Sequence, residues 1–285
     1  MLITRRGGKL TLITQPEHAR LAGELAARWG NERFAAPAAR AALITAAAHH
    51  DDGWLELDPL PAYNDRQRRP AHFTELPLTE TVGPYTRGVE SVYALDPHAG
   101  ALASMHFSGF YTARWGIQGG SPSDNPLAAE IVATQEARWM PALREAWGYR
   151  GPRSEFDADT WHAYEVLQAL DVISLGLGLT DLSQPSGDHE AVVVTSTLGR
   201  LDQPPGARIV PAVPVGAGHQ RVDLTLCVAE PWRLQVDPYP FSEPRFELAL
   251  QARELEDRQY ASAQDAASAL QAAELRELTI AVGAA

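Results

Sequence analysis

The chain has 285 residues, of which 45% are hydrophobic and 21% charged, and these proportions exclude disordered and fibrous classes. Its formal net charge of −12 argues against a general nucleic-acid surface, because such surfaces neutralise phosphates with Lys and Arg. The single cysteine, Cys227, excludes an intramolecular disulfide and a thiolate zinc site, so any metal must be held by His and carboxylates.

No segment has the pattern of a membrane span or of a secretion signal. The longest nearly apolar stretch, residues 41–48, is far shorter than the roughly 20 residues that a transmembrane helix needs. The first ten residues, MLITRRGGKL, contain no apolar run followed by a small-residue cleavage pattern. We therefore expect a cytoplasmic protein that binds a small-molecule substrate and contacts neither membrane nor nucleic acid.

The first thirty residues change from a strand pattern to a helix pattern. Residues 2–14 predict a β-hairpin, because alternating apolar residues flank Gly7-Gly8 and this pair accepts the positive φ angles of a tight turn. Thr14 and Glu17 then have the form of a capping box, and apolar residues recur at helical spacing as far as residue 30.

The middle of the chain predicts further helices. The helix over residues 37–50 is apolar nearly all round and is expected to be buried. Residues 55–77, rich in proline and charge, are predicted to be loop. Further helices are expected over residues 78–94, 96–111 and 157–177. Another is expected between a loop at residues 116–126 and about residue 147.

After about residue 188 the pattern becomes that of strands. AVVVTSTL, ARIVPAVPV, RVDLTLCVA, WRLQV and RFELALQA are separated by Gly, Pro and Asp turns, and one alanine-rich helix, residues 262–275, interrupts them. A sheet with one apolar face must bury that face against another layer. An N-terminal strand added to this C-terminal sheet would tie the two ends of the chain together.

Four ionisable residues lie on segments that are predicted to be buried helices: His18, His50, Asp51 and Asp171. A carboxylate in a helical core must be paired or bound to a cation, because burying it alone costs several kcal/mol or more. Imidazole with carboxylate suits Fe, Mn, Zn or Co. The set therefore predicts one or two divalent transition-metal ions, although a lone buried histidine is more often a core residue with a backbone hydrogen bond.

These residues carry a resemblance to a known superfamily. A His, then a His-Asp doublet in AAAHHDDGW, then a distant Asp in LQALDVISL resembles the HD-domain superfamily of metal-dependent phosphohydrolases over about residues 15–180. The resemblance matches His18 to the first ligand, His50 and Asp51 to the doublet, and Asp171 to the last ligand. The whole chain also resembles an uncharacterised bacterial family, a domain of unknown function with HD-like features.

The resemblance also implies places for a second ion and for proton transfer. His106 falls where two-metal members of the superfamily place further histidines; His98 or His72 would join it, and Asp51 would bridge the ions. His106 or Asp52 would move the proton.

Each of two further groups of residues has two possible interpretations from the sequence. His49, with Asp52, would orient His50, or the two would form the cap and turn that close the helix. Arg66, Arg68 and Arg69 would clamp a substrate phosphate, because guanidinium groups match phosphate oxygens, or they form a solvated face.

The expected fold class is α+β, as a mainly helical HD-like bundle. Residues 15–182 would form this bundle, residues 1–14 an N-terminal hairpin, and residues 189–285 a β-rich part packed on it, in one cooperative unit. The expected function is a metal-dependent hydrolase of a small phosphate ester or nucleotide-like substrate. The alternatives are an HD-fold dinuclear iron oxygenase and a non-catalytic protein that binds a ligand or partner.

Overall fold

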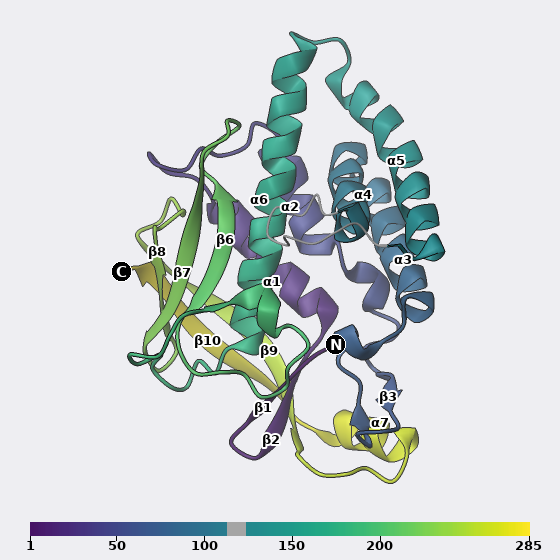
Figure 1. Cartoon of the computed structure of the whole chain (residues 1–285), viewed down its shortest axis with the longest axis vertical. Coiled ribbons are helices and arrows are strands. Elements are labelled where there is room, and N and C mark those ends of the chain that lie inside the picture. Colours follow the sequence, from purple (N-terminus) through teal and green to yellow (C-terminus); the bar gives the residue numbers. More distant parts are fainter. Residues whose placement is uncertain (113–123) are drawn as a thin grey trace.

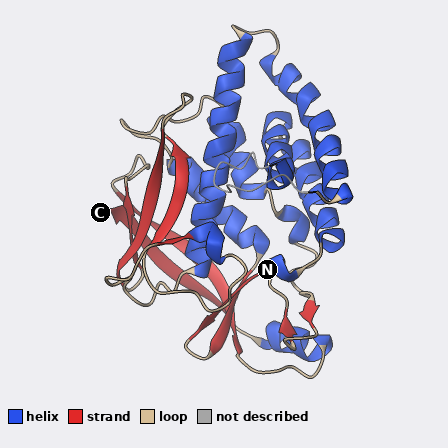
Figure 2. Ribbon diagram, viewed as in Figure 1, coloured by secondary structure: helices blue, strands red, loops and turns tan. Residues whose placement is uncertain are grey.

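The computed structural model describes residues 1–112 and 124–285 as a sheet covered on one side by helices (Figures 1 and 2). The sheet has eight strands in the order β1-β2-β9-β10-β8-β7-β6-β5. Neighbouring strands are antiparallel except in the pairs β10–β8 and β5–β6. The strands are β1 (Leu2–Arg6), β2 (Lys9–Ile13), β5 (Val192–Val193), β6 (Arg208–Pro214), β7 (Arg221–Glu230), β8 (Arg233–Asp237), β9 (Arg245–Glu256) and β10 (Leu275–Ala284).

The helices form the second layer. Helices α1 and α6 lie against the sheet, and α2, α3, α4 and α5 lie beyond them (Figure 1). Among the described residues the helices are α1 (Gln15–Arg28), α2 (Arg40–His49), α3 (Leu78–Leu95), α4 (Pro97–Thr112), α5 (Pro126–Trp147), α6 (Arg153–Leu179) and α7 (Ala263–Ala272). The predicted helices therefore exist, with ends that differ by a few residues.

The first two strands form the predicted hairpin. Arg6 pairs with Lys9 across the turn, where Gly7 and Gly8 have φ angles of +54° and +76°. Two positive φ angles in a two-residue loop are typical of a type I′ turn, whose twist matches that of the strands. Strand β2 then pairs antiparallel with β9, with Leu10 opposite Leu255. The two ends of the chain are thus tied into one sheet, as the sequence suggested.

The expectation of a mainly helical, HD-like bundle is wrong. The molecule is α+β, with an eight-stranded sheet that takes strands from both ends of the chain and packs along α1 and α6. Because strand pairing joins residues far apart in the sequence, the separate strand patterns did not reveal one large sheet. One helix of the expected bundle, α6, lies directly on the strands.

Helix α6 is the link between the sheet and the other helices. Nearly all of its residues from Thr160 to Leu179 are buried. On its sheet side, a Cβ at Gly176 would lie 3.4 Å from Leu226 Cδ1 of β7, and one at Gly178 would lie 3.0 Å from Leu2 Cδ2 of β1. These small residues let the helix approach both the N-terminal hairpin and the C-terminal strands closely. The position of α6 is therefore set by the sheet.

Of the two predicted loops, residues 55–77 contain short regular elements, and part of residues 116–126 lies outside the described residues. Within residues 55–77, the strands β3 (Tyr63–Asn64) and β4 (Arg69–Pro70) form a small sheet, and short 3-10 turns occupy Asp52–Trp54 and Phe73–Glu75. Residues 116–123 of the predicted loop at 116–126 lie outside the described residues. Within the described residues, none of the helices has the length and apolarity to cross a bilayer; the cytoplasmic location stays a prediction.

A truncation tests the expectation of one cooperative unit. A fragment of residues 1–188 would expose the sheet side of α6 and leave β2 without its partner β9. We expect this fragment to be insoluble or to melt without a sharp transition, since its apolar surface has lost its covering layer. Circular dichroism melting beside the full chain measures this, and a soluble fragment with a sharp transition would contradict it.

Candidate metal centre

Imidazole and carboxylate side chains converge where α1, α2, α4 and α6 meet. They are His18 of α1, His50 at the C-cap of α2, Asp51 directly after it, His106 of α4 and Asp171 of α6. Each is at most 4% exposed. The five residues predicted as ligands thus lie together in one buried cluster.

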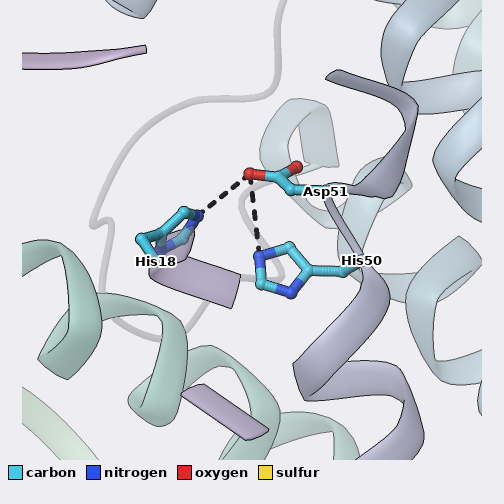
Figure 3. A group of neighbouring side chains, drawn as sticks. All are labelled: His18, His50 and Asp51. Carbon is cyan, nitrogen blue, oxygen red and sulfur yellow. Dashed lines mark hydrogen bonds and ion pairs between the residues drawn. The ribbon is translucent and has the colours of Figure 1, made fainter. Parts of the chain in front are cut away.

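The distances within the cluster suit a metal ion. Figure 3 shows the rings of His18 and His50 directed toward Asp51; His18 Nε2 is 2.9 Å and His50 Nε2 3.9 Å from Asp51 Oδ2. Asp171 places Oδ1 3.5 Å from His50 Nε2 and Oδ2 3.7 Å from His106 Nε2. Ligand atoms lie within 4.8 Å of one another in two overlapping groups, His18 with His50 and Asp51, and His50 with His106 and Asp171. Either group could hold an ion.

Hydrogen bonds fix how two of the imidazoles face this centre. The hydroxyl of Ser174 donates to the Asp171 carbonyl oxygen at 2.8 Å, so Ser174 Oγ accepts from His18 Nδ1 at 2.9 Å. His50 Nδ1 donates to the carbonyl oxygen of Ala47 at 2.9 Å. In both rings Nε2 is left to face the carboxylates. This is how ligating histidines are usually oriented, with Nδ1–H on an oxygen and Nε2 toward the ion.

Charge interactions within the cluster are strong because it is buried. Burial disfavours the charged form of His50, but the carboxylates of Asp51 and Asp171 outweigh burial and raise the pKa of His50 to about 9. Burial also works against the charged form of Asp171, yet the interaction with His50 and the nearby imidazoles lower its pKa. Burial lowers the pKa of His106 to about 4, despite the carboxylate of Asp171. The centre thus favours a cation beside two carboxylates and a neutral His106.

The end of α2 presents the His-Asp doublet through a close contact with α3. The helix ends at His50, and Asp51 leaves the helical region with φ −110° and ψ 13°. A Cβ at Gly53 would lie 1.9 Å from the carbonyl oxygen of Pro84, and one at Gly88 would lie 2.7 Å from that of His50. Only glycine fits at these two contacts, so they fix the backbone on which the doublet sits.

The cluster forms one wall of a pocket of about 190 Å³. The other walls are mainly aromatic and apolar, so the pocket is small and largely uncharged apart from the cluster. Besides the five cluster residues, the pocket is lined by Gln15, Phe73, Thr74, Tyr85, Phe110, Leu175 and Leu198.

Two residues assigned supporting roles lie beside the pocket rather than on it. His49 is partly exposed, and its Nδ1 lies 2.8 Å from Asp52 Oδ2. Neither residue lines the pocket, and the side-chain hydrogen bond described for them joins them to each other rather than to His50. This placement agrees with the cap-and-turn interpretation, and it leaves Asp52 away from a bound substrate.

The two further histidines considered for a second ion lie elsewhere. His72 is fully buried, but its Nδ1 accepts from the Thr74 backbone N–H at 3.3 Å and caps the turn at Phe73–Glu75. His98 packs against Phe156, with ring centroids 5.7 Å apart. Neither belongs to the metal-ligand groups found in the described part of the chain.

The three arginines predicted as a phosphate clamp do not line the pocket. Arg69 is buried and forms an ion pair with Glu75 at 2.6 Å. Arg68 is exposed and donates to the Tyr260 carbonyl oxygen at 3.3 Å, and Arg66 is exposed. The clamp gains no support from this placement.

Gln15 and Ser174 belong to the site but were not identified as such from the sequence. Gln15 lies three residues before His18, and Ser174 three residues after Asp171, so each shares a helix face with a ligand. That spacing is the only signal in the sequence. Many polar residues in a helix have it, and it becomes informative only when the ligands are known.

Comparison with known proteins gives a family without a described reaction. Residues 1–257 match the family described as "Protein of unknown function (DUF3891)", and the chain belongs to this family. No curated protein and no solved structure matches the chain. The resemblance to an uncharacterised family is thereby confirmed, and the function has to be argued from the site.

Adding one methyl group at Gly53 tests the backbone contact behind the doublet. Gly53→Ala would place Cβ against the α3 backbone, and such overpacking costs about 1–3 kcal/mol of unfolding free energy. We expect a lower melting temperature and weaker metal binding. Gly218→Ala is the control, because no heavy atom lies within 4 Å of its Cβ position, and its stability should change by less than about 0.5 kcal/mol. Equal melting temperatures for the two variants would contradict the prediction.

Proposed function

We propose that this member of the DUF3891 family is a metal-dependent hydrolase of a small phosphate ester, nucleotide-like substrates included. The observation that carries the proposal is the meeting of His18, His50, Asp51 and Asp171 at the wall of a pocket. Their order along the chain, His, His-Asp, Asp, resembles that of the HD-domain phosphohydrolases. The resemblance concerns the ligand set and does not extend to the architecture.

Unpaired polar atoms in the cluster fit a bound cation. Asp51 Oδ1 is buried and makes no hydrogen bond with any described residue, and His50 Nε2 is buried with only the carboxylates of Asp171 and Asp51 near it, at 3.5 and 3.9 Å. A buried polar atom without a partner costs about 1–3 kcal/mol, more when charged, so such atoms usually mark an ion, a water or a ligand. Two imidazoles and two carboxylates form the donor set preferred by Fe, Mn, Zn or Co. We therefore propose a divalent transition metal held by His18, His50, Asp51 and Asp171.

The overlap of the two ligand groups favours one ion. Both groups use His50, and its Nε2 carries one lone pair, so it can bind only one metal ion. In the metal-free protein a proton on His50 balances part of the carboxylate charge, and the ion would replace this proton. A second ion would need His106 and Asp171 without His50. We propose a mononuclear centre in which His106 is not a ligand and has another role.

The residues around the ion can then serve hydrolysis. The ion itself would polarise a phosphoryl oxygen and activate the attacking water. His106 lines the pocket and its low pKa keeps it neutral near pH 7, so it can accept a proton from that water. Asp171 Oδ2, 3.7 Å from His106 Nε2, would stabilise the imidazolium that forms. The aromatic walls limit access of bulk water.

A dinuclear or mononuclear iron oxygenase is the second candidate. Each of the two groups contains two histidines and one carboxylate, the donor set of many non-haem iron oxygenases, and the pocket walls are largely apolar. Metal analysis and electronic spectra of the purified protein separate the candidates. Iron with oxygen consumption would favour the oxygenase, and turnover in a screen of phosphate esters with any ion would favour the hydrolase. Absence of any metal would favour a non-catalytic binding protein.

Removing one ligand should remove the metal. We expect the purified protein to contain about one transition-metal ion per chain, and His50→Ala and Asp51→Ala each to lose it, as measured by elemental analysis. A chelator should also lower the melting temperature of the wild type, because a ligand present at 100 times its Kd stabilises the folded state by about 2.7 kcal/mol. His219→Ala, in an exposed loop, is the control. Unchanged metal content in both ligand variants would refute the site.

Substituting His106 separates proton transfer from metal binding. With one ion, His106→Ala should keep about one metal per chain and lose about 100-fold or more in kcat for phosphate-ester hydrolysis. If the wild type instead holds two ions and the variant one, His106 is a ligand of a dinuclear centre. Full activity with full metal content would reduce His106 to a core residue.

A further inference from the structure

Gln15 carries a buried side-chain amide on the wall of the metal pocket. It is 1% exposed, and it lines the pocket together with His18 and Asp51. Its Oε1 is buried and has no hydrogen-bond partner among the described residues. Most buried amides are satisfied by the protein itself. An unsatisfied one on a pocket wall indicates a ligand that completes its hydrogen bonds.

The backbone holds Gln15 in this place independently of its side chain. Gln15 is the first residue of α1, and its N–H donates to Asp58 Oδ2 at 2.6 Å. Asp58 is itself buried, and its other oxygen lies 3.2 Å from the amino group of Met1. His18 follows one turn later on the same helix face. Gln15 is therefore fixed relative to a proposed metal ligand, while its Oε1 has no hydrogen-bond partner among the described residues.

We infer that Gln15 is a catalytic residue whose amide binds the phosphoryl group and its attacking water beside the metal ion. This inference rests on the proposed function. An amide has an NH₂ donor and a carbonyl acceptor. The donor suits a non-bridging phosphoryl oxygen and the acceptor suits an O–H of the water, so a phosphate ester with its nucleophile satisfies both ends. Being uncharged, the amide adds no repulsion toward the anion, whereas a carboxylate at the same position would.

The experiment measures binding of inorganic phosphate, a product of monoester hydrolysis, to the metal-loaded full-length protein by calorimetry. Loss of a hydrogen bond to a charged group should weaken phosphate binding by about 10- to 100-fold in Gln15→Ala. Gln15→Glu keeps the size of the side chain but should weaken binding further. Metal content should stay unchanged in Gln15→Ala, because the ligands and the Asp58 bond to the backbone remain. Gln15→Glu should melt at a lower temperature, because it buries a carboxylate beside Asp51.

Gln168→Ala is a matched control. Gln168 is also 1% exposed and lies three residues before the ligand Asp171, but it does not line the pocket. Its loss should leave phosphate affinity within about twofold of the wild type.

The outcomes separate failure of the inference from failure of the proposed function. Wild-type affinity in Gln15→Ala, with phosphate binding and ester hydrolysis intact, would overturn the role of Gln15 and leave the hydrolase standing. A metal-loaded wild type that neither binds phosphate nor hydrolyses esters would overturn both. Equal weakening in Gln15→Ala and Gln168→Ala would also overturn the inference, because it would show a general effect of removing a buried amide.

Discussion

The structure depends on keeping two carboxylates, Asp51 and Asp171, inside a helical core. Each is at most 4% exposed, and an uncompensated charge there would cost several kcal/mol or more. The raised pKa of His50 places a positive charge beside them, and the imidazoles of His18 and His106 approach the carboxylates from α1 and α4. No single helix provides this arrangement, so α1, α2, α4 and α6 must meet at one point. The sheet and the packing between the helices hold those four helices at that point.

The sheet contributes to the site without supplying a ligand. Helix α6 lies with Gly176 and Gly178 against the N-terminal hairpin and the C-terminal part, and nearer its N-terminus it presents Asp171 and Ser174 to the cluster. The hairpin of β1 and β2 joins the C-terminal strands through β9, so both ends of the chain support the same helix. The β-rich part thus helps to position α6, although it supplies no member of the metal-ligand groups found among the described residues.

The buried cluster of His and Asp residues could be predicted from the sequence, whereas the single eight-stranded sheet and the pocket could not. His18 and Asp171 stand out because ionisable residues on apolar helices need partners, and this requirement is local. The single eight-stranded sheet depends on pairing between residues more than 200 positions apart, such as Leu10 with Leu255, which no local pattern encodes. The arginine cluster illustrates a different limit: its composition suggested phosphate, but Arg69 is committed to Glu75 by the direction of its side chain. Gln15 lines the pocket and Gln168 does not, although each lies three residues before one of the cluster residues, and this spacing could not distinguish them.

Charge balance explains why a divalent ion suits this cluster better than protons alone. Two buried carboxylates carry two negative charges, and a divalent ion with neutral imidazoles cancels them within one coordination shell. Without the ion, the raised pKa of His50 places one positive charge beside them, while His106, with its pKa near 4, contributes none near neutral pH. With an ion bound, the centre would be close to neutral, so excess carboxylate charge would not repel an incoming phosphate. No cationic side chain among the residues that line the pocket would then attract it either. A neutral hydrogen-bonding group such as Gln15 can then contribute to binding without disturbing that balance.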